Sequence, residues 1–126
     1  MHYVSTRDSA RRLTASEAIV EGLSRDGGLY LPESIPQITL ADIQALSALP
    51  YPQRAAKIMK LYLDEFTEQE LLSYAEKAYG PAKFDTPAAA PVVKTEDSTY
   101  VQELWHGPTC AFKDMALQML PYLLTA

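Results

Sequence analysis

Residues 105–114, WHGPTCAFKD, gather the side chains of this chain that are best suited to chemistry. They include its only Trp and its only Cys, and the apolar segment MALQMLPYLL follows after Lys113 and Asp114. On a helix, Leu117, Leu120 and Leu124 fall on the same face as Lys113, so the lysine heads an apolar stripe. This arrangement raises the question of what the amine does there.

A lysine in this position favours amine chemistry. Apolar surroundings and the positive end of a helix both destabilise the ammonium form. A neutral amine is the nucleophile that condenses with an aldehyde. The competing interpretation is that Lys113 simply extends its head group into water, as most lysines at an apolar edge do. The neighbouring residues have equally plain interpretations: a turn hydrogen bond for His106, packing for Cys110 and a first-turn acid for Asp114.

Composition excludes several classes of protein. The chain has 126 residues, 48% of them hydrophobic and 21% charged, as in an ordinary globular domain. A net charge of −5 without a block of Lys or Arg argues against a nucleic-acid partner. No stretch approaches the roughly 20 apolar residues of a membrane span. One Cys allows no internal disulfide and fits a cytoplasmic location, and one Cys with two His residues makes a structural zinc site improbable.

The first 80 residues are expected to form a mostly helical unit. In LTASEAIVEGLSRDGG, Thr14 and Glu17 have the spacing of a capping box, and Asp26-Gly27-Gly28 is expected to end the helix. The run LYLP that follows predicts one short extended element.

Three more helices are predicted before residue 80. One is capped by Thr39, and a second has Pro52 in its first turn. The last has a capping box at Thr67 and Glu70 and ends at Gly80.

The remaining residues predict a change of architecture. Residues 81–91 are rich in proline and are expected to be a linker or domain crossing. Residues 92–126 then read as two short strands around a polar turn, followed by a helix from about Cys110 to the end with Thr109 as its N-cap. The expected fold is α/β: a mostly helical domain over residues 1–80, the linker, and the first strand and helix elements of a second domain.

Two segments of the chain resemble one known family. LWHGPTCAFKDMALQML is similar to the lysine-bearing motif of threonine synthases, whose pattern runs close to H-G-P-T-x-A-F-K-D. YVSTRD and EAIVEGLSRDGGLYLP resemble the N-terminal signature of that family, S-T-R followed by a G-L-x-x-D-G-G-L-[YF]-x-P run. The two motifs stand in the family's order and bracket nearly the whole chain, which makes the pair more specific than either motif alone.

The resemblance implies an enzyme of fold type II that depends on pyridoxal 5′-phosphate and converts O-phospho-L-homoserine and water to L-threonine and phosphate. Carried onto this chain, Lys113 would hold the cofactor as a Schiff base and move protons between substrate carbons. Phe112 and Asp114 would shape the cofactor pocket, Phe112 by packing and Asp114 by fixing the loop. The cofactor would supply the electron sink, and the protein would supply orientation and proton transfer.

Family members are much longer, so the resemblance also implies an N-terminal fragment without the phosphate loop or most of the substrate pocket. We expect such a piece to be inactive by itself and to bind the cofactor weakly or not at all. Lys113 should be more exposed than in a complete enzyme, and the apolar stripe should favour a homo-oligomer.

Two alternatives stay open from the sequence. The first is a related enzyme, either a threonine-synthase-like phospholyase or another fold type II member. The second is a helical interaction module without chemistry, although a module that only packs does not need the dense loop ahead of Lys113.

Overall fold

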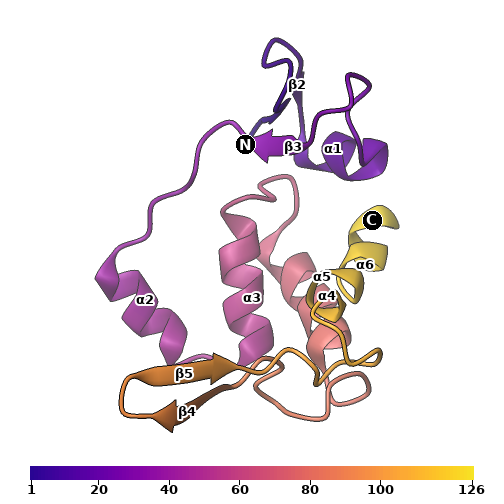
Figure 1. Ribbon diagram of the computed structural model, residues 1–126. Coiled ribbons are helices and arrows are strands. Elements are labelled where there is room, and N and C mark those ends of the chain that lie inside the picture. Colours follow the sequence, from indigo (N-terminus) through magenta and orange to yellow (C-terminus); the bar gives the residue numbers. More distant parts are fainter.

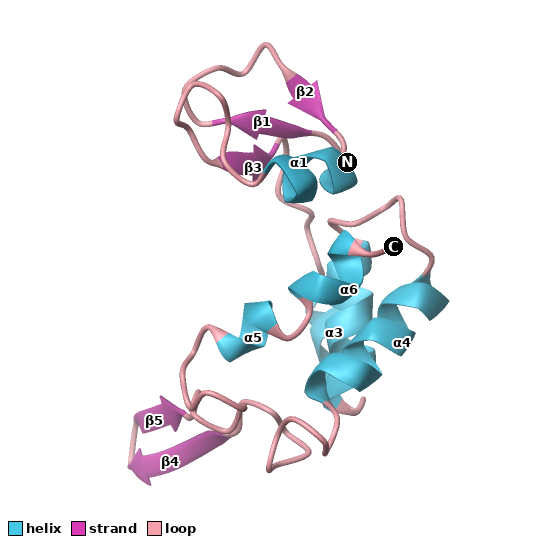
Figure 2. Ribbon diagram, turned by 90° about the vertical axis from the view of Figure 1, so that its right-hand side faces the viewer, coloured by secondary structure: helices cyan, strands magenta, loops and turns pink.

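The computed structural model describes all 126 residues, arranged as an N-terminal lobe, a helical body and a β-hairpin (Figure 1). The lobe and the hairpin lie at opposite ends of the body in both ribbon views (Figure 2). The mixture of helices and short strands confirms the α/β class.

The N-terminal lobe contains a small antiparallel sheet and one helix. Its strands β1 (Tyr3–Ser5), β2 (Arg12–Leu13) and β3 (Tyr30–Pro32) have the order β2-β1-β3. The prediction of a single extended element was wrong here, because β1 and β2 are too short to show an alternating pattern. Strand β1 is held by pairing with the distant β3, and β2 is held by pairing with β1.

Helix α1 (Ala15–Glu21) begins as predicted and ends earlier. The Thr14 side chain accepts from the Glu17 N–H, and the Glu17 carboxylate accepts from the Thr14 N–H, which confirms the capping box. The helix ends at Gly22, whose φ of 71° suits glycine and whose N–H donates to the Ala18 carbonyl. The predicted stop at residues 26–28 was therefore wrong; these residues form a separate turn.

The helical body is built on α3 (Tyr51–Lys60) and α4 (Glu68–Tyr79), which pack against each other. The predicted capping box of α4 and its end at Gly80 are confirmed, as is the early proline of α3. Helix α2 (Leu40–Ser47) has the predicted cap at Thr39 but buries none of its residues.

The core lies on the facing sides of α3 and α4 and extends into the C-terminal third. Its buried members come from both helices, from the turn before α4, from the proline-rich linker and from the end of the chain: Ala56, Phe66, Leu71, Ala75, Ala78, Tyr79, Phe84, Ala89 and Met119. In α4, Leu71, Ala75, Ala78 and Tyr79 are buried, and Leu72 packs at the edge of the core.

The C-terminal third forms the predicted hairpin but not the predicted helix. Strands β4 (Val92–Glu96) and β5 (Thr99–Gln102) pair antiparallel across a two-residue turn. The final segment is broken into α5 (Asp114–Leu117) and α6 (Leu120–Leu124), so the single helix from about Cys110 was wrong. Pro121 explains the break, because its ring lacks an N–H and clashes with the carbonyl four residues earlier in an unbroken helix.

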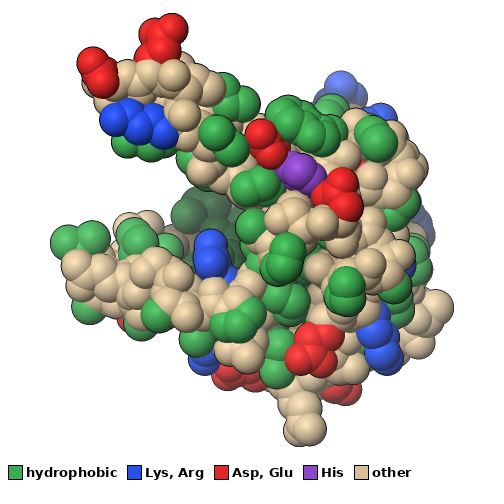
Figure 3. Space-filling model, turned by 90° about the horizontal axis from the view of Figure 1, so that it is seen from below, with side chains coloured by type: hydrophobic (Ala, Val, Ile, Leu, Met, Phe, Trp, Pro, Cys, Tyr) green, Lys and Arg blue, Asp and Glu red, His purple; other side chains and the backbone are tan.

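The surface is unusually large and apolar for this chain length. Its accessible area is 8174 Å², whereas a compact monomer of 14.0 kDa exposes about 6,700 Å². Figure 3 shows hydrophobic side chains spread over one face, with a hollow between two projecting parts of the molecule. Several exposed apolar residues belong to the hairpin and to α6, and both elements therefore offer faces that the chain itself does not cover.

No helix in the structure is long and apolar enough to span a membrane.

Candidate active site

Lys113 lies directly before α5, and its side chain is exposed. It takes part in none of the side-chain hydrogen bonds or salt bridges of the structure, so no group of this chain occupies the amine. The stripe behind it is present but uncovered, with Leu117 49% and Leu124 46% exposed. The apolar surroundings expected for the amine are therefore not supplied by this chain.

Asp114 has the opposite environment, with only 1% of the residue exposed. Its Oδ2 accepts from the Thr109 N–H at 2.8 Å and from the Thr109 hydroxyl at 3.0 Å, and its Oδ1 accepts from the Gln118 amide at 3.3 Å. Thr109 is thus a donor to Asp114 and not the predicted N-cap of a helix. Burial by itself raises the pKa of Asp114, but the donors on Thr109 and Gln118 outweigh it and lower the pKa below its usual value.

Gly107 makes room for the Asp114 carboxylate. A Cβ at residue 107 would lie 2.6 Å from the Asp114 Cβ and 2.7 Å from its Oδ2. The Gly107 carbonyl accepts from the Cys110 N–H at 3.1 Å, which closes the turn. The glycine of the motif is therefore required for close packing of the loop against the carboxylate.

Tyr79 connects the core to the broken end of the chain. Its hydroxyl donates to the Met115 carbonyl at 2.7 Å, and the residue is 4% exposed. In a continuous helix the Met119 N–H would bond to Met115, but here it donates to Ala116 at 3.1 Å. Tyr79 thus satisfies a carbonyl that the helix break leaves free, and burial raises the pKa of its hydroxyl, with a smaller effect of Tyr51.

His106 is held between two carboxylates at the start of the loop. Its Nδ1 lies 2.6 Å from Asp85 Oδ1, and its Nε2 lies 2.7 Å from Glu103 Oε2. The Asp85 N–H also donates to the His106 carbonyl at 3.2 Å. Hydrogen bonds to Glu103 and Asp85 raise the pKa of His106. The imidazole therefore ties the linker and the end of the hairpin to the first residue of the HGPT run.

The other motif residues are open to contact from outside. Phe112 is 66% exposed beside Lys113. Cys110 is also exposed and has a φ of 55°, a backbone conformation that residues other than glycine seldom adopt. No cluster of three or more His, Cys, Asp or Glu side chains is arranged to hold a metal ion.

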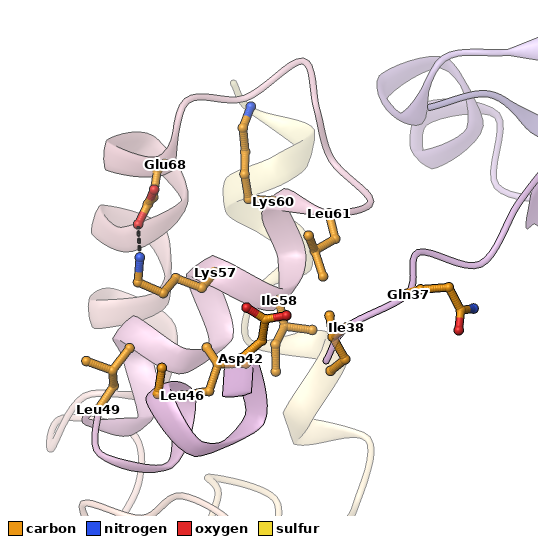
Figure 4. A pocket seen from close by; sticks show the side chains of 11 residues that line it. Gln37, Ile38, Asp42, Leu46, Leu49, Lys57, Ile58, Lys60, Leu61 and Glu68 are labelled. Carbon is orange, nitrogen blue, oxygen red and sulfur yellow. Dashed lines mark hydrogen bonds and ion pairs between the residues drawn. The ribbon is translucent and has the colours of Figure 1, made fainter. Parts of the chain in front are cut away.

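A cavity of about 530 Å³ lies elsewhere, between α2 and α3 (Figure 4). Apolar side chains of both helices line it, and its Lys57 is paired with Glu68 at 2.8 Å. None of residues 105–114 contributes to this cavity, so it is separate from the lysine loop.

Sequence reasoning identified Lys113, Phe112 and Asp114 but missed the residues that support them. Tyr79 and Asp85 are 36 and 21 residues from their partners, and no local spacing connects them. Glu103, three residues before His106, was the one partner with a local signal.

The fold and the loop together define an α/β chain that presents an unpaired lysine amine on a hydrogen-bonded turn, a side chain of the kind used in covalent amine chemistry. Residues 2–79 match the family model described as threonine synthase N terminus. The chain belongs to the threonine synthase family.

Similar proteins cover the lysine loop as well. Threonine synthase of Pseudomonas aeruginosa is 39% identical over 98% of this chain and 26% of its own length. The crystal structure of PLP-bound threonine synthase from Brucella melitensis matches with a TM-score of 0.90 and 41% identity, over 98% of this chain and 26% of that one. Yeast threonine synthase matches with a TM-score of 0.86 and 37% identity, over 97% of this chain and 25% of that one. The chain thus spans about a quarter of the length of these relatives.

Proposed function

We propose that the complete protein containing this chain is a threonine synthase, a pyridoxal-phosphate-dependent lyase that converts O-phospho-L-homoserine and water to L-threonine and phosphate. The observation that carries the proposal is the free, exposed amine of Lys113 in a chain whose relatives are named threonine synthase, one of them described with PLP bound. Bound cofactor supplies an aldehyde that condenses with amines and a ring that withdraws electrons from substrate carbons.

In this proposal each residue of the loop has a distinct role. The Lys113 amine would hold the cofactor and would move protons between neighbouring substrate carbons. The ring of Phe112, which is 66% exposed, would pack against the bound cofactor. Asp114 acts indirectly. Its carboxylate accepts hydrogen bonds from Thr109 and Gln118 and so fixes the turn that would orient Lys113.

The finer features belong to the same proposal. The protein would have fold type II, act on a small-molecule substrate without nucleic acid or membrane, and work in the cytoplasm, which its single Cys supports. We propose domain boundaries at residues 1–80, 81–91 and 92–126. The 126-residue chain would be inactive alone, because Lys113 is exposed and the apolar stripe behind it is uncovered.

The test measures threonine and phosphate formation from O-phospho-L-homoserine by the complete protein. Lys113→Ala should abolish turnover and the visible absorbance of bound cofactor, and borohydride reduction should label the peptide that contains Lys113. Lys113→Arg is the matched control, because it keeps the positive charge and most of the side-chain length. Its guanidinium stays protonated and cannot form a Schiff base with the cofactor, so this variant should be equally inactive.

Different outcomes separate the alternatives. Release of phosphate without threonine would identify a threonine-synthase-like phospholyase. An active Lys113→Ala variant would refute the assignment of the lysine. A complete protein without visible absorbance and without turnover would favour the non-catalytic interaction module, and turnover by the isolated 126-residue chain would contradict its proposed inactivity.

A further inference from the structure

The contacts of His106 require a particular protonation state. Both ring nitrogens face carboxylate oxygens, at 2.6 Å on the Asp85 side and 2.7 Å on the Glu103 side. An ionised carboxylate only accepts hydrogen bonds, so each nitrogen must carry a proton to make both contacts. A neutral imidazole has one N–H and can satisfy only one of the two acids.

These contacts join the lysine loop to the end of the hairpin and to a linker residue 21 positions earlier in the chain. Asp85 belongs to the proline-rich linker, and Glu103 directly follows β5. The Glu103 N–H in turn donates to the Pro91 carbonyl at 2.9 Å. The His106 side chain is 16% exposed, compared with 23% for Glu103 and 73% for Asp85. Figure 3 shows acidic side chains on both sides of a histidine on the lower face.

The loop that carries Lys113 is consequently fixed at both ends. His106 holds its beginning, and Asp114 holds its end through Thr109. Gly107, next to His106, packs directly against the Asp114 carboxylate, so a movement of one end displaces the other.

We propose that His106 is a positioning residue for Lys113, which clamps the lysine loop to the linker and to the hairpin only while its imidazole is doubly protonated. The proposal rests on the threonine synthase activity proposed above for its functional consequence, but the clamp itself does not depend on that activity. The charged groups that face His106 are Asp85 and Glu103, and Trp105 stacks on the ring with centroids 5.6 Å apart.

The pKa of His106 determines the pH range in which the clamp is intact. Glu103 and Asp85 raise the pKa of His106 in the folded protein. The clamp is therefore complete below the ordinary histidine pKa and is lost as the pH rises through the higher folded value. Activity that depends on the clamp should fall in that alkaline range.

The first experiment observes the imidazole directly, by NMR of the complete protein labelled with ¹⁵N-histidine. The His106 signal is identified by its loss in His106→Gln. At neutral pH both ring nitrogens should be protonated, and the titration should move to lower pH in Glu103→Gln and in Asp85→Asn. Glu96→Gln, an exposed acid at the far end of β4, is the control and should leave the titration unchanged. A singly protonated ring at neutral pH, or equal titrations in Glu103→Gln and Glu96→Gln, would overturn the clamp.

The second experiment tests positioning through the pH profile of kcat in the complete protein. The alkaline limb should move to lower pH in Glu103→Gln and Asp85→Asn, and it should disappear in His106→Gln, which has no titrating group. A merely structural residue would reduce activity equally at every pH, and that result would overturn the positioning role. If the clamp is seen by NMR while no threonine is formed at any pH, the proposed function fails and the clamp stands.

Discussion

Removing the Tyr79 hydroxyl should destabilise the chain without altering its packing. Tyr79→Phe keeps the buried ring, with its edge contacts to Tyr51 at 5.1 Å and Phe84 at 5.8 Å between centroids. It deletes the 2.7 Å hydrogen bond to the Met115 carbonyl, which has no other donor at the helix break. Loss of such a bond, with a half-buried acceptor left unpaired, costs about 2 kcal/mol.

The assay is urea unfolding followed by circular dichroism. With a slope of about 1–2 kcal/mol/M, a loss of about 2 kcal/mol lowers the midpoint by about 1–2 M. Tyr74→Phe is the matched control, because Tyr74 stacks on Tyr122 at 6.0 Å but its hydroxyl makes no hydrogen bond. Its free energy of unfolding should change by less than about 0.5 kcal/mol. If the two variants unfold at the same urea concentration, Tyr79 does not support the broken helix as described.

Three further predictions concern the loop and the uncovered surface. Gly107→Ala places a Cβ 2.6 Å from the Asp114 Cβ, and the required shift should lower the free energy of unfolding by about 1–3 kcal/mol in the same urea assay. Asp114 has a lowered pKa in the fold, so its contribution to the free energy of unfolding is present above the unfolded pKa and is lost as the pH falls through the folded pKa. Acid titration should therefore show a smaller loss of stability below about pH 4 for Asp114→Asn than for the unmodified chain or for the exposed hairpin variant Asp97→Asn. Equal acid profiles would contradict this. Sedimentation of the isolated chain should show concentration-dependent association through its uncovered apolar faces. A double change of Leu117→Ser in α5 and Leu124→Ser in α6 should weaken this association, and a clean monomer at all concentrations would count against it.

Local chemistry allowed much of the fold to be predicted from the sequence. The caps at Thr14, Thr39 and Thr67 depend on hydrogen bonds within four residues, and all three occur where the sequence places them. The hairpin turn and the end of α4 at Gly80 are local in the same way. The family resemblance rested on the same kind of signal, contiguous motifs at both ends of the chain, and the match to residues 2–79 confirms it.

The sequence-based predictions of secondary structure were wrong where a competing interaction outweighed a local pattern. The apolar period that begins at Lys113 predicts one helix, but Pro121 breaks it, and the freed carbonyl is satisfied by Tyr79 from another helix. Likewise β1 exists because it pairs with β3, which begins 25 residues after β1 ends. Neither Tyr79 as the donor nor β3 as the pairing strand can be predicted from local spacing, because each meets its partner only after the chain has folded.

The candidate site shows the same division between local and distant information. A motif can mark the reactive amine of Lys113, because the chemistry resides in a single side chain. Its orientation depends on Asp114, Gly107 and His106, and through His106 on Asp85 in a segment that the sequence marks only as a linker or domain crossing. The orientation of the amine therefore depends on a residue outside the ten-residue motif as well as on residues within it. A substitution as remote and exposed as Asp85→Asn should change the pH at which the lysine works while leaving its chemistry intact.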